Sequence, residues 1–195
     1  MSKKLTHFKK GFTLVETMVA ISILMLAILG PLSIAAAGLR NSAYARDQIT
    51  AYYLAQEAIE FARDKRDDNY FKNFNNPSTP ISWLYGLNTE CSSTGGCVLD
   101  SLEWFKGNPP TKQCNATAVP DDCGSQQMYV TTDGYYTYET PTGAIPARYK
   151  RIIKITPVSG SSDEVTVTAY MSWTAAGGAQ KSFQLTENMF NIYKN

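Results

Sequence analysis

The sequence predicts an α+β protein in which a long N-terminal helix packs on a C-terminal antiparallel β-sheet. Three patterns predict it: an apolar run over residues 12–39, a helical repeat of apolar residues that continues over 40–71, and alternation of apolar and polar residues over 165–174. The length of 195 residues suits one domain with an appendage. A hydrophobic content of 44% against 18% charged residues indicates an ordered chain.

The first element is an apolar helix over residues 12–39, in which Glu16 is the only charged residue. A helix of 28 residues covers roughly 42 Å, more than the hydrocarbon core of about 30 Å. Four lysines and no acid precede it, and positive charge stays on the cytoplasmic side. We therefore expect a single membrane pass with residues 40–195 outside the cytoplasm.

A cleaved secretory signal and a plain signal anchor both account for an apolar run. Neither accounts for Glu16, because a charge within a membrane helix costs about 2.5–3.5 kcal/mol at the centre and less near an end. Glu16 therefore needs a partner that it meets later.

The stretch Lys10-Gly11-Phe12-Thr13-Leu14-Val15-Glu16 resembles the processing site of type IV prepilins and pseudopilins. The resemblance implies that residues 1–11 are a leader peptide, removed between Gly11 and Phe12 by a membrane-embedded prepilin peptidase. That enzyme would also methylate the new amino group of Phe12. The fold implied is type IV pilin-like.

The resemblance also implies a role for Glu16. Subunits leave the lipid of the membrane and stack their apolar helices into a homo- or heteropolymeric filament, where Glu16 neutralises the N-terminal amine of a neighbouring pilin subunit. Because a buried charge without its partner costs several kcal/mol, the pair disfavours wrongly registered insertion. Pro31 lies inside the same segment and predicts a kink, or local melting during assembly.

Residues 40–71 are expected to continue the helix as an amphipathic segment that enters the globular domain. Glu57 and Glu60 lie three residues apart, which is typical of a solvated helix face near Arg63 and not of a catalytic pair. The apolar face is expected to consist of Ala43, Ala45, Ile49, Ala51, Leu54, Ala55, Ala58, Ile59 and Ala62, and the polar face of Arg46, Asp47, Gln56, Glu57, Glu60, Arg63 and Asp64.

Residues 72–126 are rich in proline, glycine and asparagine and are expected to be irregular. Their four cysteines do not have zinc-site spacing, and an even count behind a membrane segment indicates disulfides. Three pairings exist, and Cys91–Cys97 with Cys114–Cys123 is preferred because it closes two short loops, although sequence does not fix connectivity.

No metal or cofactor site is expected in this chain. Its single histidine, His7, lies in the leader, so histidine-based catalysis and metal binding are excluded after cleavage. Asp121 and Asp122 are too few oxygen ligands for calcium. Asn115-Ala116-Thr117 matches an N-glycosylation acceptor, which is a weak signal.

Residues 127–195 are expected to form the antiparallel sheet. Its clearest strand is Val165–Trp173, and Gly177-Gly178 is expected to turn it into the next strand. One face of the sheet should pack on the apolar face of the helix. The other expected strands are 127–132, 135–139 after an Asp133-Gly134 turn, 147–156 ended by Pro157, 180–185, and an edge strand or cover over 185–193.

These expectations favour a structural filament subunit, a minor pilin, over an enzyme, since no catalytic set is visible. A pseudopilin of a type II secretion or DNA-uptake system shares the same N-terminal segment. A membrane-anchored adhesin or binding module is the other alternative, with Tyr135, Tyr136 and Tyr138 as a recognition surface, although aromatic residues also suit ordinary strands. Outside the leader, 14 basic and 17 acidic residues give a charge of −3, so nucleic acid is not an expected partner. The expected location is the inner membrane and then an extracellular pilus or pseudopilus.

Overall fold

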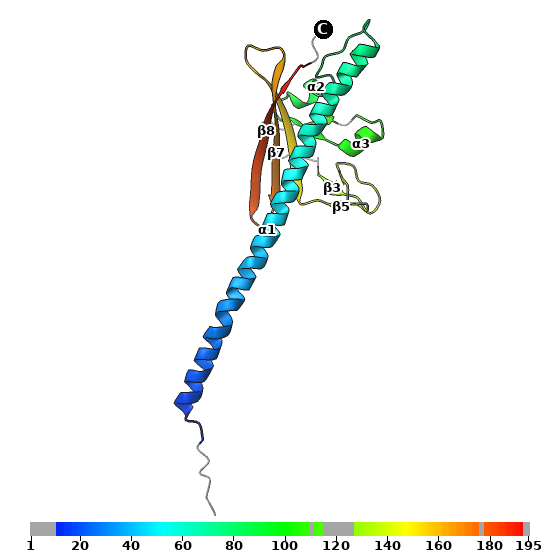
Figure 1. Ribbon diagram of the computed structural model, residues 1–195. Coiled ribbons are helices and arrows are strands. Elements are labelled where there is room, and N and C mark those ends of the chain that lie inside the picture. Colours follow the sequence, from blue (N-terminus) through cyan, green and yellow to red (C-terminus); the bar gives the residue numbers. More distant parts are fainter. Residues whose placement is uncertain (1–10, 110, 115–126, 176–177, 193–195) are drawn as a thin grey trace, which may run out of the picture. The chain divides into compact units, whose positions relative to one another are not determined.

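A computed structural model describes residues 11–109, 111–114, 127–175 and 178–192. The chain falls into two units that meet between Tyr44 and Ala45. Among the described residues, the first unit contributes residues 11–13 and the start of the long helix, whereas the second contains the rest of that helix, two short helices and the strands (Figure 1). The predicted α+β class is confirmed.

Helix α1 spans Leu14–Asn75. It begins two residues later than expected, after Thr13, and ends four residues beyond residue 71, just before Pro77. Pro31 lies inside α1, and the helix continues through it without a break.

The buried face of α1 belongs to the second unit. It includes Ala51, Ala55, Ala58 and Ala62, which are all fully buried. The expected apolar face was wrong at its start, because Ala45 and Ile49 are exposed whereas Asp47 is buried. The buried residues are Asp47, Ala51, Leu54, Ala55, Ala58, Ile59, Phe61, Ala62, Lys65 and Asn69.

The main sheet has five antiparallel strands in the order β2-β1-β6-β7-β8. The three long strands are β6 (Tyr149–Pro157), β7 (Glu164–Thr174) and β8 (Gln180–Phe190). The alternation predicted for β7 is confirmed, since Val165, Val167, Ala169, Met171 and Trp173 are all buried. The second half of α1 shares one hydrophobic core with β7 and β8.

The last part of the chain differs from the expectation in one respect. The segment expected to add a separate edge strand or cover over 185–193 instead continues the preceding strand. A single strand, β8, covers Gln180–Phe190 and forms the edge of the sheet.

The region expected to be irregular contains four short regular elements between residues 88 and 113, where that expectation was wrong, and residues 115–126 lie outside the described residues. Two strands of three residues each, β1 (Cys97–Leu99) and β2 (Thr111–Gln113), extend the main sheet beyond β6. Two short helices accompany them, α2 (Asn88–Cys91) and α3 (Ser101–Phe105). The Asp100 carboxylate caps α3 by accepting from the backbone N–H groups of Leu102 and Glu103.

A second, small sheet has the order β4-β3-β5, with β3 Tyr129–Val130, β4 Tyr136–Thr137 and β5 Ile145–Pro146. The turn predicted at Asp133-Gly134 is present. The Gly134 N–H donates to the Thr131 carbonyl at 3.0 Å, and Gly134 has φ 85°, a conformation that glycine adopts without strain. The strands predicted over 127–132 and 135–139 are shorter than expected and belong to this separate sheet.

Candidate functional site: the N-terminal segment and the helix–sheet groove

The junction between Gly11 and Phe12 lies just before α1, in backbone that is neither helix nor strand. The Phe12 side chain is 80% exposed. Among the described residues, chain neighbours apart, no heavy atom lies within 4 Å of the Cβ position at Gly11. An exposed, non-helical peptide bond beside a helix start is sterically open to an enzyme. The rest of the leader, residues 1–10, lies outside the described residues.

Glu16 lies in the first turn of α1, where the structure reveals a feature that sequence reasoning missed. The Thr13 hydroxyl accepts a hydrogen bond from the Glu16 backbone N–H at 3.2 Å. Thr13-Leu14-Val15-Glu16 therefore has the sequence of a capping box, a signal that was readable in the sequence. Glu16 also lies where an acid interacts favourably with the helix dipole. The Thr13 hydroxyl thus caps the start of the helix, and the Glu16 carboxylate lies at a favourable end of it, in addition to the intermolecular role that the resemblance implies.

The apolar part of α1 buries nothing within its own chain. It is the one helix of the described residues that is long and apolar enough to cross a membrane, and none of its most apolar window is buried. Two of its hydroxyl groups are satisfied locally, since Thr17 donates to the Leu14 carbonyl and Ser22 to the Met18 carbonyl, both at 2.8 Å. This surface suits lipid or another apolar helix.

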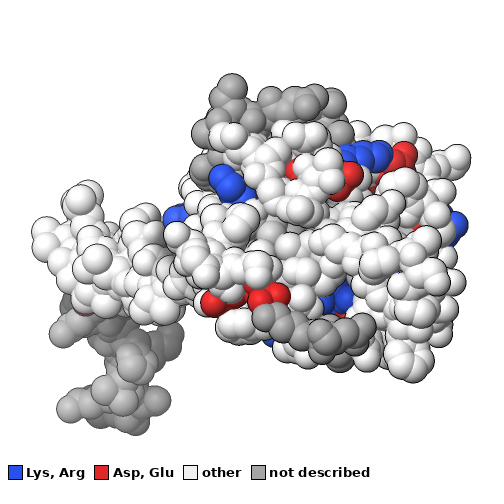
Figure 2. All heavy atoms as spheres, turned by 90° about the horizontal axis from the view of Figure 1, so that it is seen from above, with Lys and Arg blue, Asp and Glu red and all other residues white. Residues whose placement is uncertain are grey.

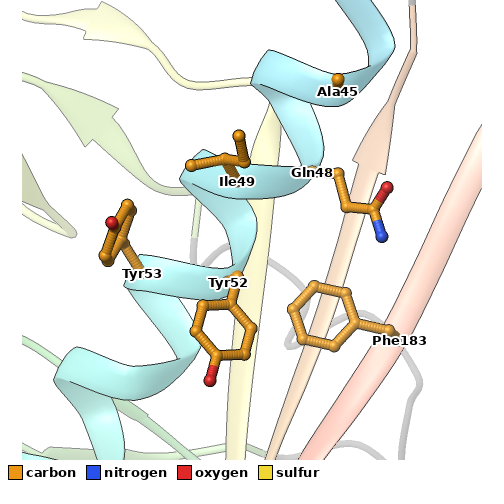
Figure 3. Close-up of a pocket in the computed structure, with 6 residues that line it drawn as sticks. All are labelled: Ala45, Gln48, Ile49, Tyr52, Tyr53 and Phe183. Carbon is orange, nitrogen blue, oxygen red and sulfur yellow. The ribbon is translucent and has the colours of Figure 1, made fainter.

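In the second unit, an apolar groove of about 430 Å³ lies between α1 and the edge strand β8. Figure 3 shows the rings of Tyr52 and Phe183 facing each other across it, while Gln48 points from the helix toward the strands. Ile49, Tyr52 and Tyr53 are 47–65% exposed, although they are large and mostly apolar. The remaining lining residue is Ala45, so no charged residue lines the groove.

A buried cation, Arg151 of β6, joins the helix to the sheet. Its guanidinium donates to the carbonyls of Leu54 on α1 and Leu99 on β1, both at 2.7 Å, and to the Glu57 carboxylate at 3.0 Å. The Ser101 hydroxyl binds the same carboxylate. Glu57 was expected on a solvated face and is instead an ion-pair partner, 37% exposed.

Tyr138 completes this buried network. Its hydroxyl donates to the Arg151 backbone carbonyl at 2.9 Å, and its N–H donates to the Asp100 carboxylate at 2.8 Å. Burial raises the pKa of Tyr138 to about 12. Of the three tyrosines considered as a recognition surface, Tyr135 is 62% exposed, whereas Tyr136 is half-buried and Tyr138 is buried. They therefore do not form one exposed surface.

Two further buried charges attach α1 to its domain. Asp47 accepts from Arg148 at 3.2 Å and from the Tyr149 hydroxyl at 3.4 Å, which explains why it tolerates burial. Lys65 is 6% exposed and lies 4.0 Å from the centre of the Trp104 ring, a cation–π geometry. Burial lowers the pKa of Lys65.

The structure joins Cys91 to Cys97 in a disulfide, with 4.5 Å between their Cα atoms. Cys114 is also disulfide-bonded. Cys123, the sequon at residues 115–117 and the acids at 121–122 lie outside the described residues. Within the described part of the chain, no group of three or more histidine, cysteine or acidic side chains could hold a metal ion. In the view of Figure 2, basic and acidic side chains are interspersed on a largely uncharged face.

Residues 7–30 match the family model described as the prokaryotic N-terminal methylation motif. No curated protein and no solved structure matches the chain. The matched segment includes Gly11, Phe12, Glu16 and the start of α1. This chain thus carries, on an exposed apolar helix, the N-terminal signature of type IV pilins and pseudopilins.

Proposed function

We propose that the chain is a type IV pilin-like filament subunit. It is inserted in the inner membrane through residues 12–39, cleaved after Gly11, and N-methylated on Phe12 by prepilin peptidase. It then assembles with other subunits so that Glu16 neutralises the N-terminal amine of a neighbour. The leader comprises residues 1–11, and residues 40–195 lie outside the cytoplasm.

One observation carries the proposal: the methylation motif lies on a helix whose apolar surface has no partner within its own chain. A simple anchor needs only enough apolar length to cross the bilayer. It needs neither glycine and phenylalanine at the junction nor an acid in the first turn. A filament subunit needs all three, because its amine is created by cleavage and then buried beside an acid.

We further propose that the subunit is a minor pilin, which primes or decorates a filament built mainly of other subunits. Two stretches of α1 support this, because they resemble minor pilins. They are the Ala- and Glu-rich residues 54–60 and the Arg- and Asp-rich residues 62–68. Pro31 supplies a point at which the helix bends or melts during assembly, since proline removes one helical hydrogen bond.

Mass spectrometry of the mature chain tests the proposal. We expect an N-terminal peptide that begins with N-methylated Phe12, and recovery of a minor amount of the chain in sheared surface filaments. Recovery as the most abundant filament protein would contradict the minor role alone. An intact leader on the membrane-bound chain would contradict the proposal and favour a simple anchor that carries an adhesin or binding module.

A further inference from the structure

The main sheet ends in a long and regular open edge. Within the part of the chain that the structure describes, β8 is the last strand of the sheet and pairs only with β7, through eleven successive residue pairs without a bulge. Natural edge strands are commonly protected by bulges, prolines or several charges. β8 has no proline, and its charged residues are Lys181 and Glu187. Such an edge is a template for a further strand.

Two hydrogen bonds show which backbone groups of β8 face away from β7. The Asn191 N–H donates to the Asp163 carbonyl on the β7 side at 2.8 Å, whereas the Phe190 carbonyl accepts from Arg66 at 3.2 Å. Because these directions alternate along an antiparallel strand, one set of residues directs its N–H and C=O groups outward. That set comprises Gln180, Ser182, Gln184, Thr186, Asn188 and Phe190, of which the Phe190 carbonyl already accepts from Arg66.

The apolar groove lies beside this edge, on the side of the sheet that faces α1. Phe183 extends from β8 toward Tyr52 and forms one wall of the groove (Figure 3). A strand added to β8 would direct every second side chain to the helix-facing side of the sheet. Those side chains would lie over a groove that no charged residue lines.

We propose that the β8 edge binds an extended segment of a partner protein by strand addition, with apolar side chains at alternate positions entering the groove beside Tyr52 and Phe183. A helical partner satisfies its own backbone hydrogen bonds and would leave the outward groups of β8 unused. An extended segment uses both the edge and the groove. The proposal goes beyond filament assembly, because the partner need not be a copy of this chain.

Hydrogen exchange on the full-length chain in detergent micelles tests the proposal. The probe is a nine-residue peptide of alternating valine and threonine, added up to millimolar concentration. We expect exchange of the outward amides of Gln184 and Thr186 to slow by about tenfold or more, while the Leu185 amide, already bonded to β7, stays unchanged. A peptide with proline in place of each threonine is the control and should protect nothing.

A pair of variants separates the edge from the side chains. Both Thr186→Pro and Thr186→Val remove the hydroxyl that contacts Thr168 at 3.3 Å, but only the proline also removes an outward N–H. Proline is tolerated at such a position of an edge strand. The proline variant should lose peptide protection, whereas the valine variant should keep it.

Tyr52→Ser is the second test, because Tyr52 is 47% exposed and its replacement removes a groove wall but little of the core. It should weaken peptide binding by about tenfold. Equal binding by the proline and valine variants would overturn the proposal. The proposal would also be overturned if the peptide shielded Tyr52 while the outward amides of β8 exchanged at their original rates. That result would indicate that the peptide occupies the groove without adding a strand. Neither result depends on whether the chain polymerises.

Discussion

The two parts of α1 form one helix but meet opposite environments. From Leu14 to Tyr44 the helix carries large apolar side chains, and Leu26, Ile34 and Leu39 are each 74% exposed. From Ala45 to Asn75 it has a buried face, in which Ala51, Ala55, Ala58 and Ala62 are completely buried. The apolar surface of the first part therefore has no partner among the described residues of its own chain, whereas the second part packs within the chain.

Residue size explains the difference. The small alanines of the second part fit into the core that it shares with the sheet, and the long Arg151 side chain reaches the Leu54 carbonyl from β6. The leucine, isoleucine and methionine side chains of the first part offer more apolar area, which suits lipid or neighbouring helices. Stability of the second part should therefore respond to changes in its own core, and that of the first part to its surroundings.

The largest effect on the packed part is expected from Arg151→Met. The change leaves the carbonyls of Leu54 and Leu99 without their donor and should lower the free energy of unfolding by about 3 kcal/mol. Chemical denaturation in micelles, followed by tryptophan fluorescence, measures it. Helical circular dichroism from the apolar part should survive this transition. Simultaneous loss of both signals would contradict the separation of the two parts.

Alkaline pH should weaken the same part. Because burial raises the pKa of Tyr138 to about 12, the folded state keeps this proton to a higher pH than the unfolded chain does. The stabilisation is complete below about pH 10 and is lost between about pH 10 and 12, which amounts to about 2 to 3 kcal/mol. Denaturation midpoints measured across this range check it.

Tyr138→Phe is the control for the alkaline effect, because phenylalanine keeps the ring but has no titrating hydroxyl. The variant should be less stable at neutral pH, since the bond to the Arg151 carbonyl is lost, and should show a shallower loss at high pH. An unchanged pH slope would show that another group is responsible.

A matched pair of alanine substitutions gives the smallest effect and the sharpest contrast. Ala58 is fully buried, so Ala58→Leu should overpack the helix–sheet interface and cost about 2 kcal/mol. Ala20 is exposed in the apolar part, and Ala20→Leu should leave the unfolding of the domain unchanged. Thermal unfolding in micelles compares the two. Equal destabilisation would show that the apolar part also contributes to the folded domain.

Patterns that span many residues predicted the main elements. The helix and β7 were predictable because their apolar repeats continue over several turns or pairs. β1 and β2 were not, because three-residue strands have too short a pattern and depend on pairing with β6 far along the chain. The exposure of Ile49 also depends on tertiary packing, since its helical spacing places it near the buried face.

The candidate site was predictable where its chemistry is local. Gly11, Phe12 and Glu16 form a short contiguous motif, and the pair Cys91–Cys97 closes a short loop. Arg151 was missed, although it occupies the same alternating set as the buried Ile153 and Ile155 of β6. A charge within that inward set was the available signal. The groove beside β8 has no signal in the sequence, because its lining residues on α1 and β8 are far apart in the sequence.

The most direct test of the central claim is the incorporation of Glu16→Gln into sheared filaments. Glutamine at position 16, the third helical position, preserves the capping box but carries no charge. The control is Thr13→Val, which removes the capping hydroxyl and keeps the acid. We predict that both chains are inserted and cleaved after Gly11, that the Thr13 variant enters filaments, and that the Glu16 variant does so poorly. Normal incorporation of Glu16→Gln would show that the acid serves only to start the helix, and would contradict its pairing with a neighbour's amine.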